Sequence, residues 1–281
     1  VPVEGIPHQG QMGGKVVGLP PGRHVPPKAE DARIVSVQEF QQLSVADRRG
    51  ILAAWLEKGP LTAGEALLPI VKVAVNDADA EVRMQGLGLF RKFDGALNRA
   101  ALAGTSDPIS RQAFADVQRF VISLIPHPDA TFRRAVLHAL GPTASAQPEL
   151  VEDALLKRLP DEHDDGARAA IIAALAETVR NASSKGRPIV LDALHDTRAA
   201  VRLSAVTGVA RFHAPEAIPA LMSALDAGDP ILRAAAARSI GSQGAAARNH
   251  LSALRIRLEQ ETHPAVRREL SRTLKALGGG G

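Results

Sequence analysis

The chain has 281 residues, with no Cys, no Tyr, one Trp and 7 Phe, and its formal charge is +4. These counts exclude disulfide scaffolds, Cys-ligated zinc, iron–sulfur clusters and Cys nucleophiles, and 3% aromatic content argues against recognition by stacked aromatic side chains. The remaining composition, 45% hydrophobic and 23% charged, is that of a folded globular protein.

Residues 1–33 are rich in Gly and Pro and show neither a helical nor a strand period, so we expect an extended arm. The arm is either a leader without regular structure or a segment that lies along the protein's own body or along a partner. Its apolar residues are too numerous for a simple spacer and are candidates for partner contact: Val3, Ile6, Val16, Val17, Leu19 and Val25. Residues 278–281 form a Gly tail.

From about Ser36 onward the pattern is helical. The segments SVQEFQQL and VADRRGILAAWLEKG, within residues 36–59, predict a leading helix pair that caps the rest of the fold. Trp55 is expected to fill the core of this pair.

Six later segments repeat one pattern, a polar or Pro turn followed by an apolar residue and an Arg. They read DADAEVRMQGLGLF, HPDATFRRAVLHAL, DDGARAAIIAAL, DTRAAVRLSAVTGV, DPILRAAAARSI and HPAVRRELSRTL. The aligned arginines are Arg83, Arg133, Arg168, Arg202, Arg233 and Arg267, with spacings of 50, 35, 34, 31 and 34 residues. A repeat of about 34 residues accommodates two helices of about 12 residues with short turns.

The residues one before and seven after each aligned Arg are all apolar, for example Val82 and Phe90 around Arg83. Positions spaced by four residues lie on one face of a helix, so this stripe predicts the buried face. The long first spacing contains an extra segment at 94–106, which we interpret as a longer connection or an added turn of helix.

This pattern, a turn with Asp-Pro or His-Pro, an apolar-Arg pair and small or bulky apolar residues every ~34 positions, resembles HEAT repeats. The Ala-rich second helices look most like the bacterial group first described in phycobilisome lyases. The resemblance covers about residues 60–277 and implies an all-α, right-handed α-solenoid of about six antiparallel helix pairs, which with the leading pair spans 34–277. It also implies a ladder in which each aligned Arg pairs with a turn acid of the neighbouring repeat. The turn acids expected here are Asp79, Asp129, Asp164, Asp196 and Asp229, whereas the last repeat has His263 instead.

Four histidines, His127, His163, His195 and His263, fall in the predicted turns. Around His163 the acids Asp161, Asp164 and Asp165 offer ligands for a divalent metal ion. The alternative, which we favour, is that turn His and Asp residues cap the second helices. The predicted cofactor and metal content is therefore none.

No nucleophile elbow, P-loop, dinucleotide or zinc-protease motif occurs, so we expect no enzyme activity. The last 41 residues carry seven basic and three acidic residues. Their arginines either form a solvated end cap or dock an acidic partner; the candidates for docking are Arg255, Arg257, Arg268 and Arg272.

We expect a protein-binding scaffold or accessory subunit of a larger bacterial assembly, because solenoids leave a long curved surface free for a partner. Two alternatives remain: a subunit of a bilin lyase-like enzyme, and a weak nucleic-acid-binding HEAT-like protein. We expect neither a membrane span nor a small-molecule substrate. The start at Val1 fits removal of either Met or a signal peptide. The absence of Cys favours a periplasmic or exported protein over a cytoplasmic one.

Overall fold

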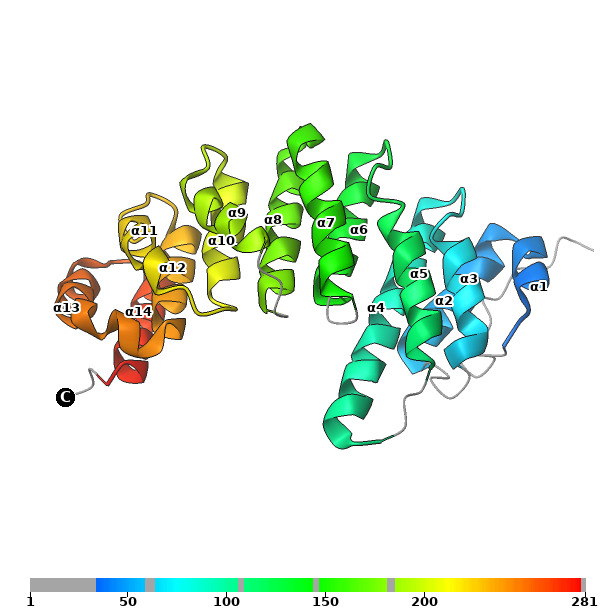
Figure 1. The fold of residues 1–281 in the computed structure, drawn as a ribbon, viewed down its shortest axis with the longest axis horizontal. Coiled ribbons are helices and arrows are strands. Elements are labelled where there is room, and N and C mark those ends of the chain that lie inside the picture. The colour runs from blue at the N-terminus through cyan, green and yellow to red at the C-terminus, as the bar shows by residue number, and fades with distance from the viewer. Residues whose placement is uncertain (1–33, 59–63, 106–108, 144–146, 181–184, 279–281) are drawn as a thin grey trace, which may run out of the picture.

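The computed structural model describes residues 34–58, 64–105, 109–143, 147–180 and 185–278, and every regular element in this part is a helix (Figure 1). The all-α prediction is therefore confirmed. None of these described helices is both long enough and apolar enough to cross a bilayer. The predicted arm at 1–33 and most of the Gly tail lie outside the described residues.

The helices form a row of antiparallel pairs (Figure 1). The leading pair is α1 (Val37–Gln42) and α2 (Val45–Lys58). In the six pairs that follow, the first helices are α3 (Gly64–Ala74), α5 (Arg111–Ile122), α7 (Pro148–Arg158), α9 (Gly186–Asp192), α11 (Ile218–Ala224) and α13 (Leu251–Gln260). The second helices are α4 (Ala80–Ala103), α6 (Ala130–Thr143), α8 (Asp165–Arg180), α10 (Ala199–Val209), α12 (Pro230–Ser242) and α14 (Pro264–Ala276). Within the described ranges, four 3₁₀ segments flank the first helices: η2 (Leu159–Asp161), η3 (Ala193–His195), η4 (Pro215–Ala217) and η5 (Gly244–His250).

The extra segment at 94–106 is mainly helix, because α4 runs for 24 residues. Its additional turns bury Leu97, and the chain leaves the helix at Gly104, whose φ of +65° is a left-handed conformation that favours glycine. Of the two interpretations, added helix is therefore correct.

Local sequence explains where the helices begin. Ser36 and Ser110 accept hydrogen bonds from the backbone N–H groups of Glu39 and Ala113, so each caps the helix that follows. Pro230 and Pro264 stand at the first position of α12 and α14, where a missing N–H costs nothing.

The predicted apolar stripe forms the core. All twelve residues one before and seven after the aligned arginines are buried: Val82, Phe132, Ala167, Val201, Leu232, Val266, Phe90, Leu140, Leu175, Val209, Ile240 and Leu274. Trp55 is fully buried beneath the leading pair, as expected. The buried residues form one continuous cluster from Val35 to Leu277, which is how stacked repeats stabilise each other.

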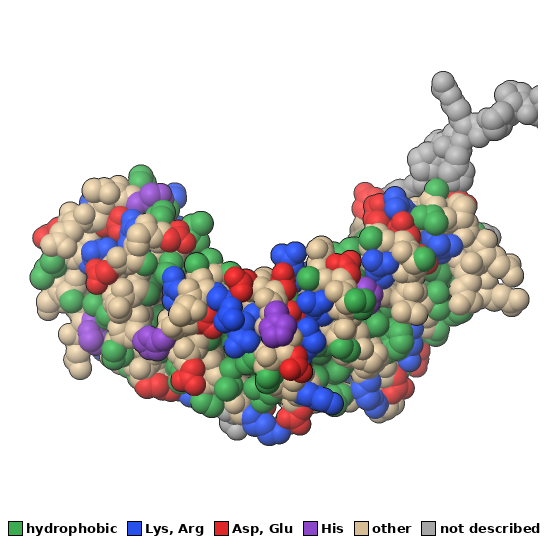
Figure 2. All heavy atoms as spheres, turned by 90° about the horizontal axis from the view of Figure 1, so that it is seen from above, with side chains coloured by type: hydrophobic (Ala, Val, Ile, Leu, Met, Phe, Trp, Pro, Cys, Tyr) green, Lys and Arg blue, Asp and Glu red, His purple; other side chains and the backbone are tan. Residues whose placement is uncertain are grey.

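The two rows of helices pack unequally. Each second helix contacts the next one along the row extensively, whereas the first helices from α5 onward contact each other little. The packing is close enough that a Cβ added to Gly208 of α10 would lie 2.7 Å from the Cβ of Ala176 of α8. A closely packed row beside a splayed one bends the stack, and Figure 2 shows the resulting hollow. Because the close row lies on the inside of the bend, the second helices line the hollow.

Candidate protein-binding surface

The turns between the first and second helix of each pair lie along one edge of the solenoid, which we call the turn ridge. Figure 2 views this edge and shows acidic and basic side chains mixed along it. The aligned arginines, here called ladder arginines, begin the second helices at this edge. Their contacts fall into two sets, one within a repeat and one between repeats.

Within a repeat, the ladder arginine closes its own turn. In four repeats, Nη1 donates to the two carbonyl oxygens six and five residues earlier, at 2.7–3.0 Å; these are the repeats of Arg83, Arg133, Arg202 and Arg233. Arg168 donates instead to the carbonyl of Leu159 at 2.8 Å, and Arg267 uses the carbonyls of Leu258 and Glu261. Sequence patterning gave no sign of this backbone contact.

Between repeats, the other edge of the guanidinium binds a carboxylate of the next repeat, a contact that we call a rung. Arg133 donates from Nε and Nη2 to the two carboxylate oxygens of Glu162, at 3.0 and 2.9 Å. Arg233 binds Glu261 in the same way, at 2.8 and 2.9 Å. Both carboxylates are almost fully buried, so these are bidentate pairs shielded from solvent.

The hydrogen bonds at these two rungs outweigh the cost of burial. Burial by itself raises the pKa of Glu162, but donation from Arg133, from the Asp164 N–H and from Arg158 brings the pKa down to about 2. The hydrogen bond from Arg233 likewise lowers the pKa of Glu261 to about 2, against burial and with help from a backbone N–H. Both glutamates are therefore charged at neutral pH.

The acid of both bidentate rungs stands six residues before the ladder arginine of its own repeat. That position holds Asp77, His127, Glu162, Asp196, Ala227 and Glu261. In five repeats the side chain at this position also accepts the N–H of the residue two positions later, so it shapes the turn as well. The expected turn acids at Asp79, Asp129, Asp164 and Asp229 stand two residues later and cap the second helices instead.

The ladder implied by the resemblance therefore needs correction. The expected partner of Arg133 is Asp164, but Glu162 takes that role, and Glu261 supplies the acid that His263 lacks. The expected pairs Arg83–Asp129 and Arg168–Asp196 do form, as long ion pairs of 4.0 and 3.9 Å. The ladder also extends back into the leading pair, where Arg48 pairs with Asp77 and Arg49 with Asp79.

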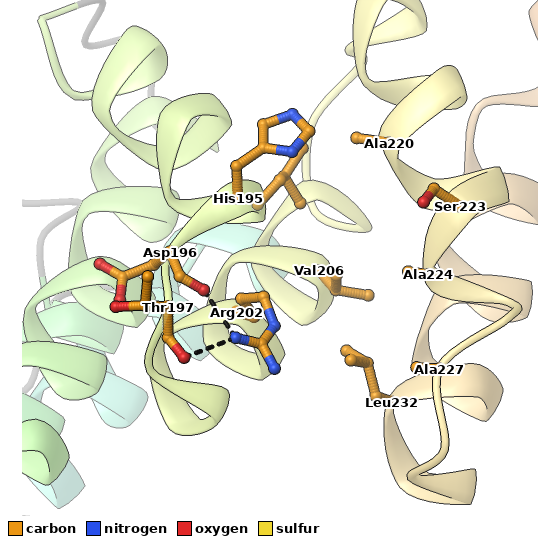
Figure 3. Close-up of a pocket in the computed structure, with 11 residues that line it drawn as sticks. His195, Asp196, Thr197, Arg202, Val206, Ala220, Ser223, Ala224, Ala227 and Leu232 are labelled. Atoms are coloured by element: carbon orange, nitrogen blue, oxygen red, sulfur yellow. Dashed lines mark hydrogen bonds between the residues drawn. The ribbon is translucent and has the colours of Figure 1, made fainter.

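Arg202 is the exception among ladder arginines that have a following repeat. Within the described residues, no carboxylate lies within ion-pair distance of its side chain. Asp229, the acid expected there, caps α12 through the Ile231 N–H. A pocket of about 360 Å³ opens beside Arg202, and Figure 3 shows its lining.

The hollow carries a second set of charges on the second helices. A cavity of about 310 Å³ lies there, with Arg91, His138, Glu177 and Arg211 around it and small residues of α6 and α8 at its base. The buried carboxylate of Glu177 pairs with Arg180 at 2.8 Å and with Arg211. Burial, together with the charges of Arg91 and Arg134, lowers the pKa of His138, so its imidazole is neutral at pH 7.

The histidine and acids proposed as metal ligands do not come together. Asp164 caps α8 through the Ala167 N–H, and Asp165 pairs with Arg198 at 2.9 Å, while His163 and Asp161 are exposed. Among the described residues, no three His, Asp or Glu side chains are placed to hold a metal ion.

The four C-terminal arginines lie on two helices and differ in role. Arg257 of α13 pairs with Asp226 at 3.0 Å and donates to the Leu225 carbonyl, so it fastens the last repeat to the one before. Arg272 pairs with Glu269 of its own helix. Arg255 and Arg268 are exposed. The predicted partner contacts of the arm, at Val3, Ile6, Val16, Val17, Leu19 and Val25, lie outside the described residues.

Comparison with known proteins agrees with this geometry. The family described as HEAT repeats matches residues 187–278, which contain the last three helix pairs. No curated protein matches the chain in sequence. The solved structure titled "Kap95:Nup1 complex" is similar at a TM-score of 0.63 and 13% identity, covering 86% of this chain and 35% of the other.

A structure of importin beta is similar at a TM-score of 0.60 and 15% identity, and again 86% of this chain matches 36% of that one. The chain thus spans about a third of the length of these two proteins. The comparisons support HEAT repeats in general and do not single out the phycobilisome-lyase group. Residues 187–278 carry the HEAT repeat pattern, and the described helices share the fold of importin-type HEAT solenoids.

Proposed function

We propose that this chain is a non-enzymatic scaffold that holds another protein in the hollow lined by the second helices. The observation that carries the proposal is the hollow itself, where acidic and basic side chains surround a 310 Å³ cavity between α6 and α8. Mixed charges beside small apolar residues suit the rim and floor of a protein interface.

The shared fold adds support. HEAT solenoids are commonly used as protein-binding scaffolds, and one of the similar solved structures is titled as a complex of Kap95 with Nup1. The proposal also extends to the arm at 1–33, which would fasten the chain as an accessory subunit of a bacterial assembly. A location outside the cytoplasm rests on the cysteine-free composition, and fractionation of cells tests it.

Site-specific photo-crosslinking tests which face holds the partner. A photoreactive residue at Ala173, beside the cavity in the hollow, is compared with one at Leu150, exposed on the first helix α7. In cells of the source organism, Ala173 should yield a discrete crosslinked product and Leu150 should not. Equal crosslinking from both sites, or none from Ala173, would overturn the assignment of the hollow.

Deletion of residues 1–33 tests the arm. If the arm fastens the chain to its assembly, the crosslinked product from Ala173 should diminish in the deleted chain. An undiminished product would remove the arm from the proposal and leave the hollow in place.

A further inference from the structure

The pocket beside Arg202 lies on the turn ridge between the fourth and fifth helix pairs. Its walls come from η3, the start of α10, α11 and the start of α12 (Figure 3). One wall is polar and includes His195, Thr197 and Arg202; the facing wall is mostly small or apolar, with Ala224, Ala227 and Leu232 among its residues.

Arg202 is oriented like Arg133 and Arg233, whose rungs are closed, that is, completed by a glutamate of the next repeat. Its Nη1 donates to the carbonyls of Asp196 and Thr197 at 2.7 and 2.8 Å, which repeats the backbone contacts of Arg133 and Arg233 (Figure 3). In those two arginines, Nε and Nη2 bind both oxygens of a glutamate. In Arg202, the same two nitrogens have no carboxylate partner among the described residues.

The missing acid has a simple origin in the sequence. The position that holds Glu162 and Glu261 in the closed rungs holds Ala227 in the fifth repeat. The side chain at this position normally accepts the N–H two residues later, and in the described structure no hydrogen bond from the Asp229 N–H is present. The Asp229 N–H and the Nε and Nη2 edge of Arg202 therefore border the place where the closed rungs hold a carboxylate.

Asp196 also lines the pocket, with its backbone carbonyl bound to Arg202, and the acids at and near the pocket have other partners. Asp196 accepts the Arg198 N–H and lies near Arg168, and Asp226 pairs with Arg257 at 3.0 Å. Asp229 caps α12. None of them neutralises Arg202, so the pocket keeps a cationic wall.

We propose that this pocket binds a carboxylate group supplied from outside the repeat, which completes the open rung. The ligand chemistry is one carboxylate, either on an Asp or Glu side chain of a protein segment or on a free small acid. Bidentate, charge-assisted pairing with a preorganised guanidinium is stronger than a neutral hydrogen bond and matches the geometry of a carboxylate. The site lies on the turn ridge and does not depend on the hollow as a partner surface.

NMR of the arginine Nε–H groups tests this directly, with the Arg202 signal assigned from an Arg202→Lys variant. The probes are sodium acetate, the peptide acetyl-Gly-Glu-Gly-amide and its Gln counterpart, each at constant ionic strength. The Arg202 signal should shift and saturate with acetate and the Glu peptide, while the Gln peptide and the signal of Arg133 should show no effect. Tighter binding of the peptide would assign the site to a protein side chain, and equal binding would assign it to free acids.

Ala227→Glu is the matched control, because it places the acid of the closed rungs in the pocket. We expect at least tenfold weaker binding of either acid to this variant, and Ala227→Gln should retain binding. Circular dichroism verifies that both variants fold. Arg202→Gln removes the site in a second way, so acetate should raise the Tm of the wild-type chain and leave the Tm of this variant unchanged. A linear, unsaturable shift of Arg202, or equal binding by Ala227→Glu, would overturn the proposal.

Discussion

Arg133 and Arg202 begin their second helices in the same way, yet only one of them closes a rung. Arg133 is buried against both oxygens of Glu162, whereas Arg202 faces a pocket of about 360 Å³. Both retain their bonds to the carbonyls of their own turn. In these two repeats the arginine closes its own turn whether or not a carboxylate of the next repeat is present, and that carboxylate depends on the side chain at one position, Glu162 or Ala227.

The largest expected effect comes from breaking the closed rung. Glu162→Ala leaves Arg133 and Arg158 without their shared carboxylate in a buried site, and such losses destabilise a protein by about 3–5 kcal/mol. Urea unfolding followed by circular dichroism measures this. Asp153→Ala, which removes an exposed pair with Lys185, should stay close to wild type. Equal losses in the two variants would contradict the importance of burial.

The pH dependence of stability distinguishes the glutamates of the closed rungs from Asp94, another buried acid. Because the pKa values of Glu162 and Glu261 fall from 4.5 to about 2 on folding, their stabilisation is complete above about pH 4.5 and is lost as the pH falls toward 2. For Glu162 this amounts to a free energy on the order of 3 kcal/mol. Burial raises the pKa of Asp94 from 3.8 to about 6, so stability should decline as the pH rises through this interval.

Two variants separate these contributions in urea unfolding across pH 2 to 8. Glu162→Gln should flatten the acid limb of the stability profile, and Asp94→Asn should remove the decline between pH 4 and 6. A profile unchanged by both substitutions would contradict the assigned pKa values.

The next largest expected loss of stability comes from the contact between α8 and α10, which lies between the rung of Arg133 and the open rung of Arg202. Gly208→Ala brings a methyl group within 2.7 Å of Ala176, so α8 and α10 must separate, with an expected loss of about 1–3 kcal/mol. Gly228→Ala is the control, because a Cβ there meets nothing within 4 Å. Thermal melts should show a lower Tm for the first variant only. Equal Tm values would show that the α8–α10 contact adjusts freely.

The smallest expected change in stability comes from supplying the missing carboxylate of the open rung from the chain itself. Ala227→Glu should raise stability by about 1 kcal/mol, through a bidentate pair with Arg202. A double-mutant cycle with Arg202→Gln isolates this pair, since the gain should disappear when the guanidinium is absent. A gain that persists without Arg202 would assign the stabilisation to the turn alone.

Much of the fold could be predicted from the sequence, because the apolar stripe around Val82 and Phe90 repeats with the period of a helix. The six ladder arginines could be found for the same reason. The partners of Arg83 and Arg168 could be predicted too, but those of Arg133 and Arg233 could not, since the resemblance pointed to Asp164 and to no acid in the last repeat. The acids at Asp77, Glu162 and Glu261, two residues before the cap position, were visible in the sequence. Sequence alone does not distinguish an acid that bridges two repeats from any other acid in a turn. The open rung at Ala227 could be recognised only as a gap in that series.

The unequal packing of the two helix rows has a mechanical consequence. The second helices touch along their length and resist compression, while the first helices from α5 onward can approach or separate with little change in contact. We therefore expect any bending of the solenoid to change the gaps between first helices more than the contacts between second helices. Between α10 and α12, among the described residues, the turn ridge also lacks the carboxylate that joins neighbouring repeats, so we expect a change of curvature to be easiest there.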